Sequence, residues 1–88
     1  MCRSIQRLYN VDPPVTSEEV LAAARQYVRK ISGSKKPSQA NVDAFEQAVA
    51  DVAEVSARLL GALVSSAPPQ DREVEAARRR RAREPARV

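Results

Sequence analysis

The chain has 88 residues, one cysteine, no histidine and a formal net charge of +4. A chain of this length forms one small domain at most, and a single thiol without imidazoles builds neither an intrachain disulfide nor a zinc site. No apolar stretch approaches the ~18 residues of a membrane span or resembles a secretory signal, so we expect a cytoplasmic protein with no membrane partner, metal or cofactor.

The positive charge is concentrated near the C-terminal end. Residues 1–66 carry a net charge of +1, and residues 67–88 carry +3. The second segment contains consecutive like charges and lacks an apolar stripe, which is typical of a solvated chain. We therefore expect a small helical domain over residues 1–66, followed by a Pro-containing linker and a disordered, Arg-rich tail over residues 67–88.

The first helix has clear start and stop signals. A lead-in segment, residues 1–15, precedes Thr16, which is a good N-cap and forms a capping box with Glu19. Gly33 supplies the left-handed residue that ends many helices. These signals predict a helix over residues 17–32.

The second helix is predicted over residues 38–64, with Ser38 as its N-cap. Its apolar positions recur at alternating steps of three and four, a seam that packs one helix against another and that a single serine interrupts. The seam consists of Val42, Phe45, Val49, Val52, Ser56, Leu59 and Leu63. The short link between the helices favours antiparallel neighbours, so the predicted fold is all-α, an antiparallel helical hairpin on which the lead-in packs.

The two predicted helices differ in length, about 24 Å against about 40 Å at 1.5 Å per residue. Three leucines of the second helix therefore project past the first helix: Leu59, Leu60 and Leu63. A leucine side chain that stays exposed to water loses about 1.5–3 kcal/mol of burial free energy. Either a second copy of the chain or the lead-in covers them, and both alternatives stay open. The apolar residues of the lead-in are Ile5, Leu8, Tyr9 and Val11.

Three stretches together resemble a known family: MCRSI at residues 1–5, QYVRKISG at residues 26–33 and KPSQAN at residues 36–41. Over roughly residues 1–64 the chain is similar to the bacterial family of uncharacterised proteins catalogued as domain of unknown function 2277. The Arg-rich tail lies outside this resemblance. The resemblance implies no activity, substrate or cofactor, so it gives no residue a catalytic role.

Cys2 is the one candidate for covalent chemistry. Removal of Met1 would leave its thiol beside the α-amine, and Arg3 favours the thiolate. Such a cysteine can act as a nucleophile or a redox sensor, whereas an isolated thiol is more often simply packed. No histidine is present to serve as its base.

Two groups of basic residues are candidates for binding anions. The link between the helices places lysines beside the predicted start of the second helix, where free N–H groups attract phosphate, or it forms only a solvated basic corner. This candidate anion site comprises Ser34, Lys35, Lys36 and Ser38. Clustered arginines attract nucleic-acid phosphates, and the candidates for such contact are Arg25, Arg29, Arg78, Arg79, Arg80 and Arg81.

The sequence favours a non-enzymatic protein-interaction module that binds a second copy or a partner helix through Leu59, Leu60 and Leu63. The first alternative is a nucleic-acid-binding accessory protein, and the second is an N-terminal cysteine enzyme or sensor. Without histidine or a Gly-rich phosphate loop, and with two helices too close to enclose a cleft, the chain lacks the features of an ordinary enzyme.

Overall fold

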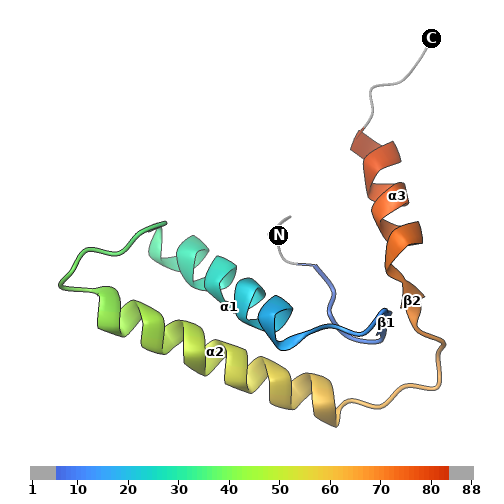
Figure 1. Cartoon of the computed structure of the whole chain (residues 1–88), viewed down its shortest axis with the longest axis horizontal. Helices are drawn as coiled ribbons and strands as arrows, with labels where there is room; N and C mark the ends of the chain where they lie inside the picture. The colour runs from blue at the N-terminus through green and yellow to red at the C-terminus, as the bar shows by residue number, and fades with distance from the viewer. Residues whose placement is uncertain (1–5, 84–88) are drawn as a thin grey trace.

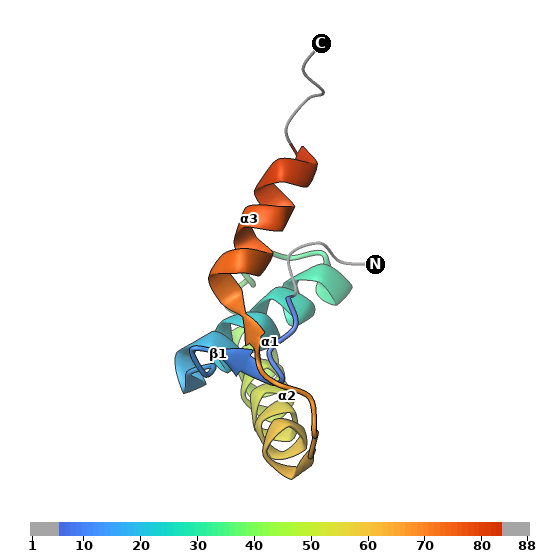
Figure 2. The same ribbon diagram turned by 90° about the vertical axis from the view of Figure 1, so that its right-hand side faces the viewer.

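The computed structural model describes residues 6–83. Its elements, in chain order, are β1 (Val11–Asp12), α1 (Ser17–Ser32), α2 (Val42–Ala62), β2 (Gln70–Asp71) and α3 (Arg72–Arg83). Helices α1 and α2 lie antiparallel as a hairpin, and α3 rises from the end at which α1 begins and α2 ends (Figure 1). Figure 2, which looks nearly along α2, shows α3 standing clear of both helices of the hairpin.

Helix α1 has the predicted bounds and the predicted caps. The Thr16 hydroxyl accepts the N–H of Glu19 at 3.2 Å, and the Glu19 carboxylate accepts the N–H of Thr16 at 3.0 Å. At the other end Gly33 has φ 69°, and its N–H donates to the carbonyl of Arg29. The helix is therefore fixed by local hydrogen bonds at both ends, as the sequence predicts.

The start of α2 differs from the prediction, because the helix begins at Val42 and not at Ser38. A turn precedes it, in which the Asn41 N–H donates to the Ser38 carbonyl at 2.9 Å and Asn41 Nδ2 donates to Ser38 Oγ at 3.2 Å. Asparagine and serine side chains that bond locally offer the backbone an alternative to the helix. The helix ends at Ala62, two residues before the predicted end.

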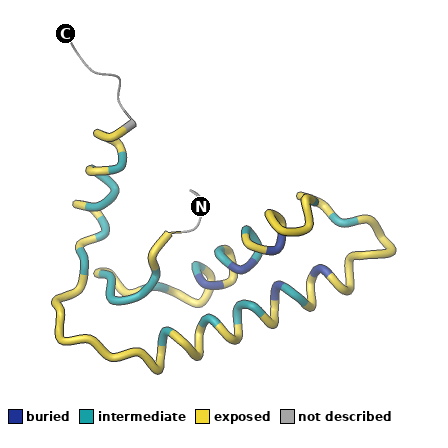
Figure 3. Tube along the Cα trace, turned by 180° about the vertical axis from the view of Figure 1, so that it is seen from behind, coloured by how far each residue is buried: buried dark blue, intermediate teal, exposed yellow. Residues whose placement is uncertain are grey.

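The core lies between α1 and α2 and is small. Its buried hydrophobic residues are Val20, Ala24, Val28, Phe45 and Val49. They occupy the facing sides of the two helices, while most of the remaining chain is half-buried or exposed (Figure 3). The radius of gyration is 15.9 Å, against about 12 Å for a compact domain of this length. The single chain is therefore an open molecule with little buried apolar surface.

The lead-in pairs with the segment that precedes α3. Strands β1 and β2 run parallel, with Val11 opposite Gln70 and Asp12 opposite Asp71. Asn10 joins the same two segments, since its carbonyl accepts the Gln70 N–H at 2.9 Å and its Nδ2 donates to the carbonyls of residues 67 and 68. The prediction of a purely all-α fold is corrected by this two-stranded sheet, which is too short to produce a periodic sequence signal.

The disordered tail stays a prediction, although the structure describes regular elements in part of this segment. Within residues 67–88, β2 and α3 are regular up to residue 83, and residues 84–88 lie outside the described residues. The Asp71 carboxylate accepts the N–H groups of Glu73 and Val74 at 2.8 and 3.1 Å, which caps α3. Acids in its first turn and arginines toward its end further suit the helix dipole.

Candidate interaction surface

An exposed apolar stripe follows the C-terminal half of α2. Val55 and Leu59 are each 56% exposed, and Leu63, just past the helix end, is 43% exposed. These residues are four apart, so they lie on one side of the helix, and we call them the distal stripe. Leu59 and Leu63 are two of the three leucines expected to project past α1, and their exposure agrees with that expectation. Their role in binding stays a prediction.

Leu60 has different surroundings from its two neighbouring leucines. It is half-buried and lines an open hollow of about 230 Å³ with Leu8, Tyr9 and Val11 of the lead-in. One residue turns a helix by about 100°, which directs Leu60 toward the lead-in and Leu59 away from it. Leu60 thus faces the hollow beside the lead-in, and the distal stripe lies outside it. Ile5, the fourth apolar residue assigned to this cover, lies outside the described residues.

An ion pair links the two helices of the hairpin near its closed end. The guanidinium of Arg25 binds the Glu46 carboxylate with both terminal nitrogens, at 2.7 and 2.9 Å. These hydrogen bonds lower the pKa of Glu46 and raise the pKa of Arg25. The charge of Arg25, a candidate for nucleic-acid contact, is therefore engaged within the hairpin.

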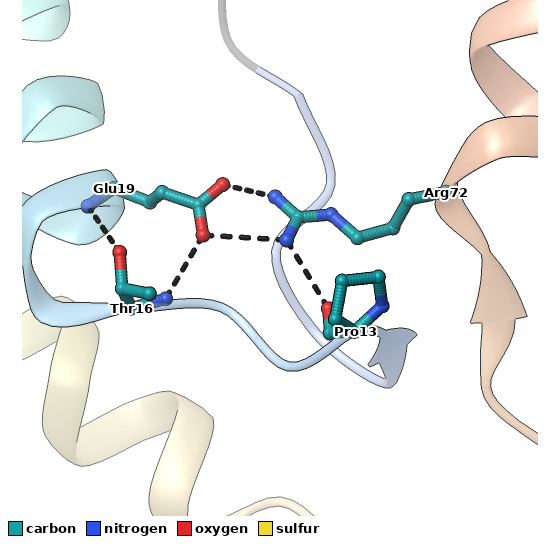
Figure 4. Close-up of polar contacts among 4 residues, drawn as sticks. All are labelled: Pro13, Thr16, Glu19 and Arg72. Atoms are coloured by element: carbon teal, nitrogen blue, oxygen red, sulfur yellow. Dashed lines mark hydrogen bonds and ion pairs between the residues drawn. The ribbon is translucent and has the colours of Figure 1, made fainter.

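A second polar junction ties α3 to the start of α1 (Figure 4). Arg72 donates to both oxygens of the Glu19 carboxylate and to the carbonyl of Pro13, the last at 3.1 Å. Hydrogen bonding by Arg72, and after it by the Thr16 backbone, lowers the pKa of Glu19. The same contact raises the pKa of Arg72. Glu19 therefore serves both the capping box of α1 and the docking of α3.

The residues of the candidate anion site do not all line one hollow. Lys35 lines an open hollow of about 610 Å³ at the C-terminal end of α1, together with Arg29. Ser34 and Ser38 line another hollow, between α1 and the start of α2, and Lys36 is exposed. Helix α2 starts at Val42, later than predicted. Anion binding by the four residues stays a prediction.

The remaining basic candidates lie on α3. Arg78 is 3.5 Å from the Glu75 carboxylate, Arg79 is half-buried, and Arg80 and Arg81 are exposed. Consecutive helical residues point about 100° apart, so these arginines surround the helix and do not form one face. Nucleic-acid contact through them stays a prediction.

Cys2 lies outside the described residues, so its proposed chemistry stays a hypothesis. Residues 6–83 contain no group of three or more metal-ligating side chains gathered around a point. None of the helices in this range combines the length and apolar character needed to cross a bilayer.

Comparison with known proteins identifies a family. A family profile described as an uncharacterised conserved protein, DUF2277, matches residues 1–78. A search of curated proteins and a search of solved structures each gave no match. The family match extends beyond the resemblance visible in the sequence, because it continues through β2 and into α3. The chain therefore belongs to the DUF2277 family of uncharacterised conserved proteins.

Proposed function

We propose that this protein is a non-enzymatic helical interaction module that associates with a second copy of itself through the distal stripe. The observation that carries the proposal is the exposure of Val55, Leu59 and Leu63 on one side of α2, beside a core of few buried residues. Large apolar side chains gathered on one exposed surface commonly mark a protein interface.

The exposed area suits a weak dimer. Full burial of a valine or leucine side chain is worth about 1.5–3 kcal/mol, and each stripe residue is roughly half-exposed. Six such side chains, three from each copy, would then contribute up to about 9 kcal/mol. Association costs at least about 4 kcal/mol of translational, rotational and side-chain entropy, so about 5 kcal/mol remains and we expect a dissociation constant on the order of 0.1–1 mM.

Charges beside the stripe favour a second copy over an unrelated helix. Asp51 and Arg58 flank Val55 on the same edge of α2, four residues before it and three after it. When two α2 helices pair antiparallel about Val55, Arg58 of each copy therefore lies beside Asp51 of the other. Both residues are exposed, and among residues 6–83 Arg58 forms no ion pair. The acidic and basic residues beside the stripe of one copy can therefore pair with those of a second copy.

Sedimentation equilibrium of the full chain from about 10 µM to about 1 mM tests the proposal, because this range spans the expected dissociation constant. Leu59→Asp should abolish the dimer by placing a charge in the contact. Ala50→Asp is the matched control, since Ala50 is exposed on the opposite side of the same helix. Leu60→Asp is less informative, because Leu60 also lines the hollow beside the lead-in.

A charge exchange tests the antiparallel arrangement. Asp51→Arg should weaken the dimer by placing two arginines together, and the double variant Asp51→Arg with Arg58→Asp should restore it. A wild-type chain that stays monomeric at about 1 mM contradicts the proposal. An equal response to Leu59→Asp and Ala50→Asp contradicts it as well.

A further inference from the structure

A hollow between the lead-in and α3 gathers several polar side chains from both segments. Its volume is about 270 Å³, well above the roughly 10–15 Å³ that one water molecule requires. The lead-in and α3 are held side by side here by the β1–β2 pair and the Arg72–Glu19 contact. The polar residues that line the hollow are Gln6, Arg7, Gln70, Arg72, Glu75 and Arg79.

Arg79 is the unusual member of this group. It is half-buried, yet among residues 6–83 its side chain forms no hydrogen bond or ion pair. Arg72 lies seven residues earlier, two helical turns away on the same face of α3, and already binds Glu19. A cation partly withdrawn from water without a partner attracts an anion.

The balance of charge in the hollow is positive. Glu75 is its one carboxylate, and this group accepts a hydrogen bond from Gln70 Nε2 at 2.8 Å. Its three arginines, Arg7, Arg72 and Arg79, carry three positive charges, against two negative charges on Glu75 and the neighbouring Glu19. Arg78, 3.5 Å from Glu75, raises the excess of positive charge from one to two. Arg7 donates through Nε to the Tyr9 carbonyl at 2.9 Å, so its terminal nitrogens keep their capacity to donate.

We propose that this hollow binds a phosphate group, with Arg79 and Arg7 as its donors. Guanidinium groups bind phosphate oxygens through paired, charge-assisted hydrogen bonds. The two arginines come from different segments and approach the hollow from different directions. The tetrahedral oxygens of a phosphate accept hydrogen bonds from several directions, whereas a carboxylate accepts them mainly in one plane, so a phosphate suits the hollow better. The phosphate belongs either to a small free anion or to a nucleic-acid backbone. This inference uses none of the residues of the distal stripe.

Calorimetric titration of the full chain with inorganic pyrophosphate and with a twelve-nucleotide oligothymidylate tests the site and separates the two sources. Arg79→Gln should weaken binding about tenfold, because it removes a charged donor. Arg81→Gln is the matched control, since it removes the same charge from the opposite side of α3 and should change binding less than about twofold. Arg79→Lys should retain part of the affinity, because it keeps the charge without the paired donors.

Each outcome decides the proposal. Pyrophosphate binding that is weakened selectively by Arg79→Gln identifies a small-anion site. Selective weakening seen only with the oligonucleotide identifies a site for backbone phosphate. Absence of saturable binding to both probes refutes the proposal, and so does an equal effect of Arg79→Gln and Arg81→Gln. Circular dichroism of each variant verifies that α3 is retained.

Discussion

Val49 should contribute far more to stability than the chemically identical Val55 on the same helix. Val49 is 1% exposed and packs with Ala24, Val28 and Phe45, whereas Val55 is 56% exposed. Truncation of Val49 to alanine removes two buried carbons, worth about 1.6 kcal/mol. The cavity left behind adds roughly 1 kcal/mol, and the better helix propensity of alanine returns roughly 0.5 kcal/mol.

The expected net loss for Val49→Ala is about 2 kcal/mol, which lowers the melting temperature by about 8–16 °C in a domain of this size. Val55→Ala should be neutral or slightly stabilising. Thermal unfolding followed by circular dichroism at about 5 µM measures both changes, because at this concentration mass action keeps a weak dimer dissociated. Equal melting temperatures for the two variants would refute the placement of the core between α1 and α2.

Gly33→Ala should cost about 1 kcal/mol because Gly33 has φ 69°. Gly61→Ala in the last turn of α2 should stabilise, but by less than the about 0.5–1 kcal/mol expected in the middle of a helix. An added Cβ meets no atom within 4 Å at either site, so thermal melts report backbone conformation alone. Glu19 should titrate below its ordinary pKa of 4.5, since Arg72 binds the carboxylate. The stabilisation from this contact is then fully present above pH 4.5 and is lost as the pH falls through the lowered pKa. Arg72→Gln should raise the pKa of Glu19 in a carboxyl ¹³C NMR titration, and an unchanged value would contradict the contact.

The parts of the fold that the sequence predicted well are those fixed by neighbouring residues. Helix α1 has both ends where Thr16, Glu19 and Gly33 place them, because each cap acts within one helical turn. The sequence predicts too early a start for α2 because Ser38 and Asn41 are both good cap residues. Their mutual hydrogen bond forms a turn and leaves Asn41 as the N-cap.

A single sequence does not predict which residues far apart in the chain contact each other. Glu19 and Arg72 are 53 positions apart, and each has an ordinary local role, the first in a cap and the second near a helix start. The two-residue strands are too short for any alternation to show. For the candidate surface, the spacing of Leu59, Leu60 and Leu63 predicts an overhang. Only the position of the lead-in reveals that Leu60, unlike Leu59, lies beside it.

The hydrogen bonds of Asn10 to residues 67, 68 and 70 close a ring of backbone that contains the α1–α2 hairpin. The entropy of closing a ring grows slowly with its length, about 0.6 kcal/mol for each doubling. Residues inserted between α1 and α2 should therefore cost little stability. Loss of the Asn10 hydrogen bonds, the β1–β2 pairing and the Arg72–Glu19 contact together would free β2 and α3 as one unit and leave the α1–α2 hairpin intact.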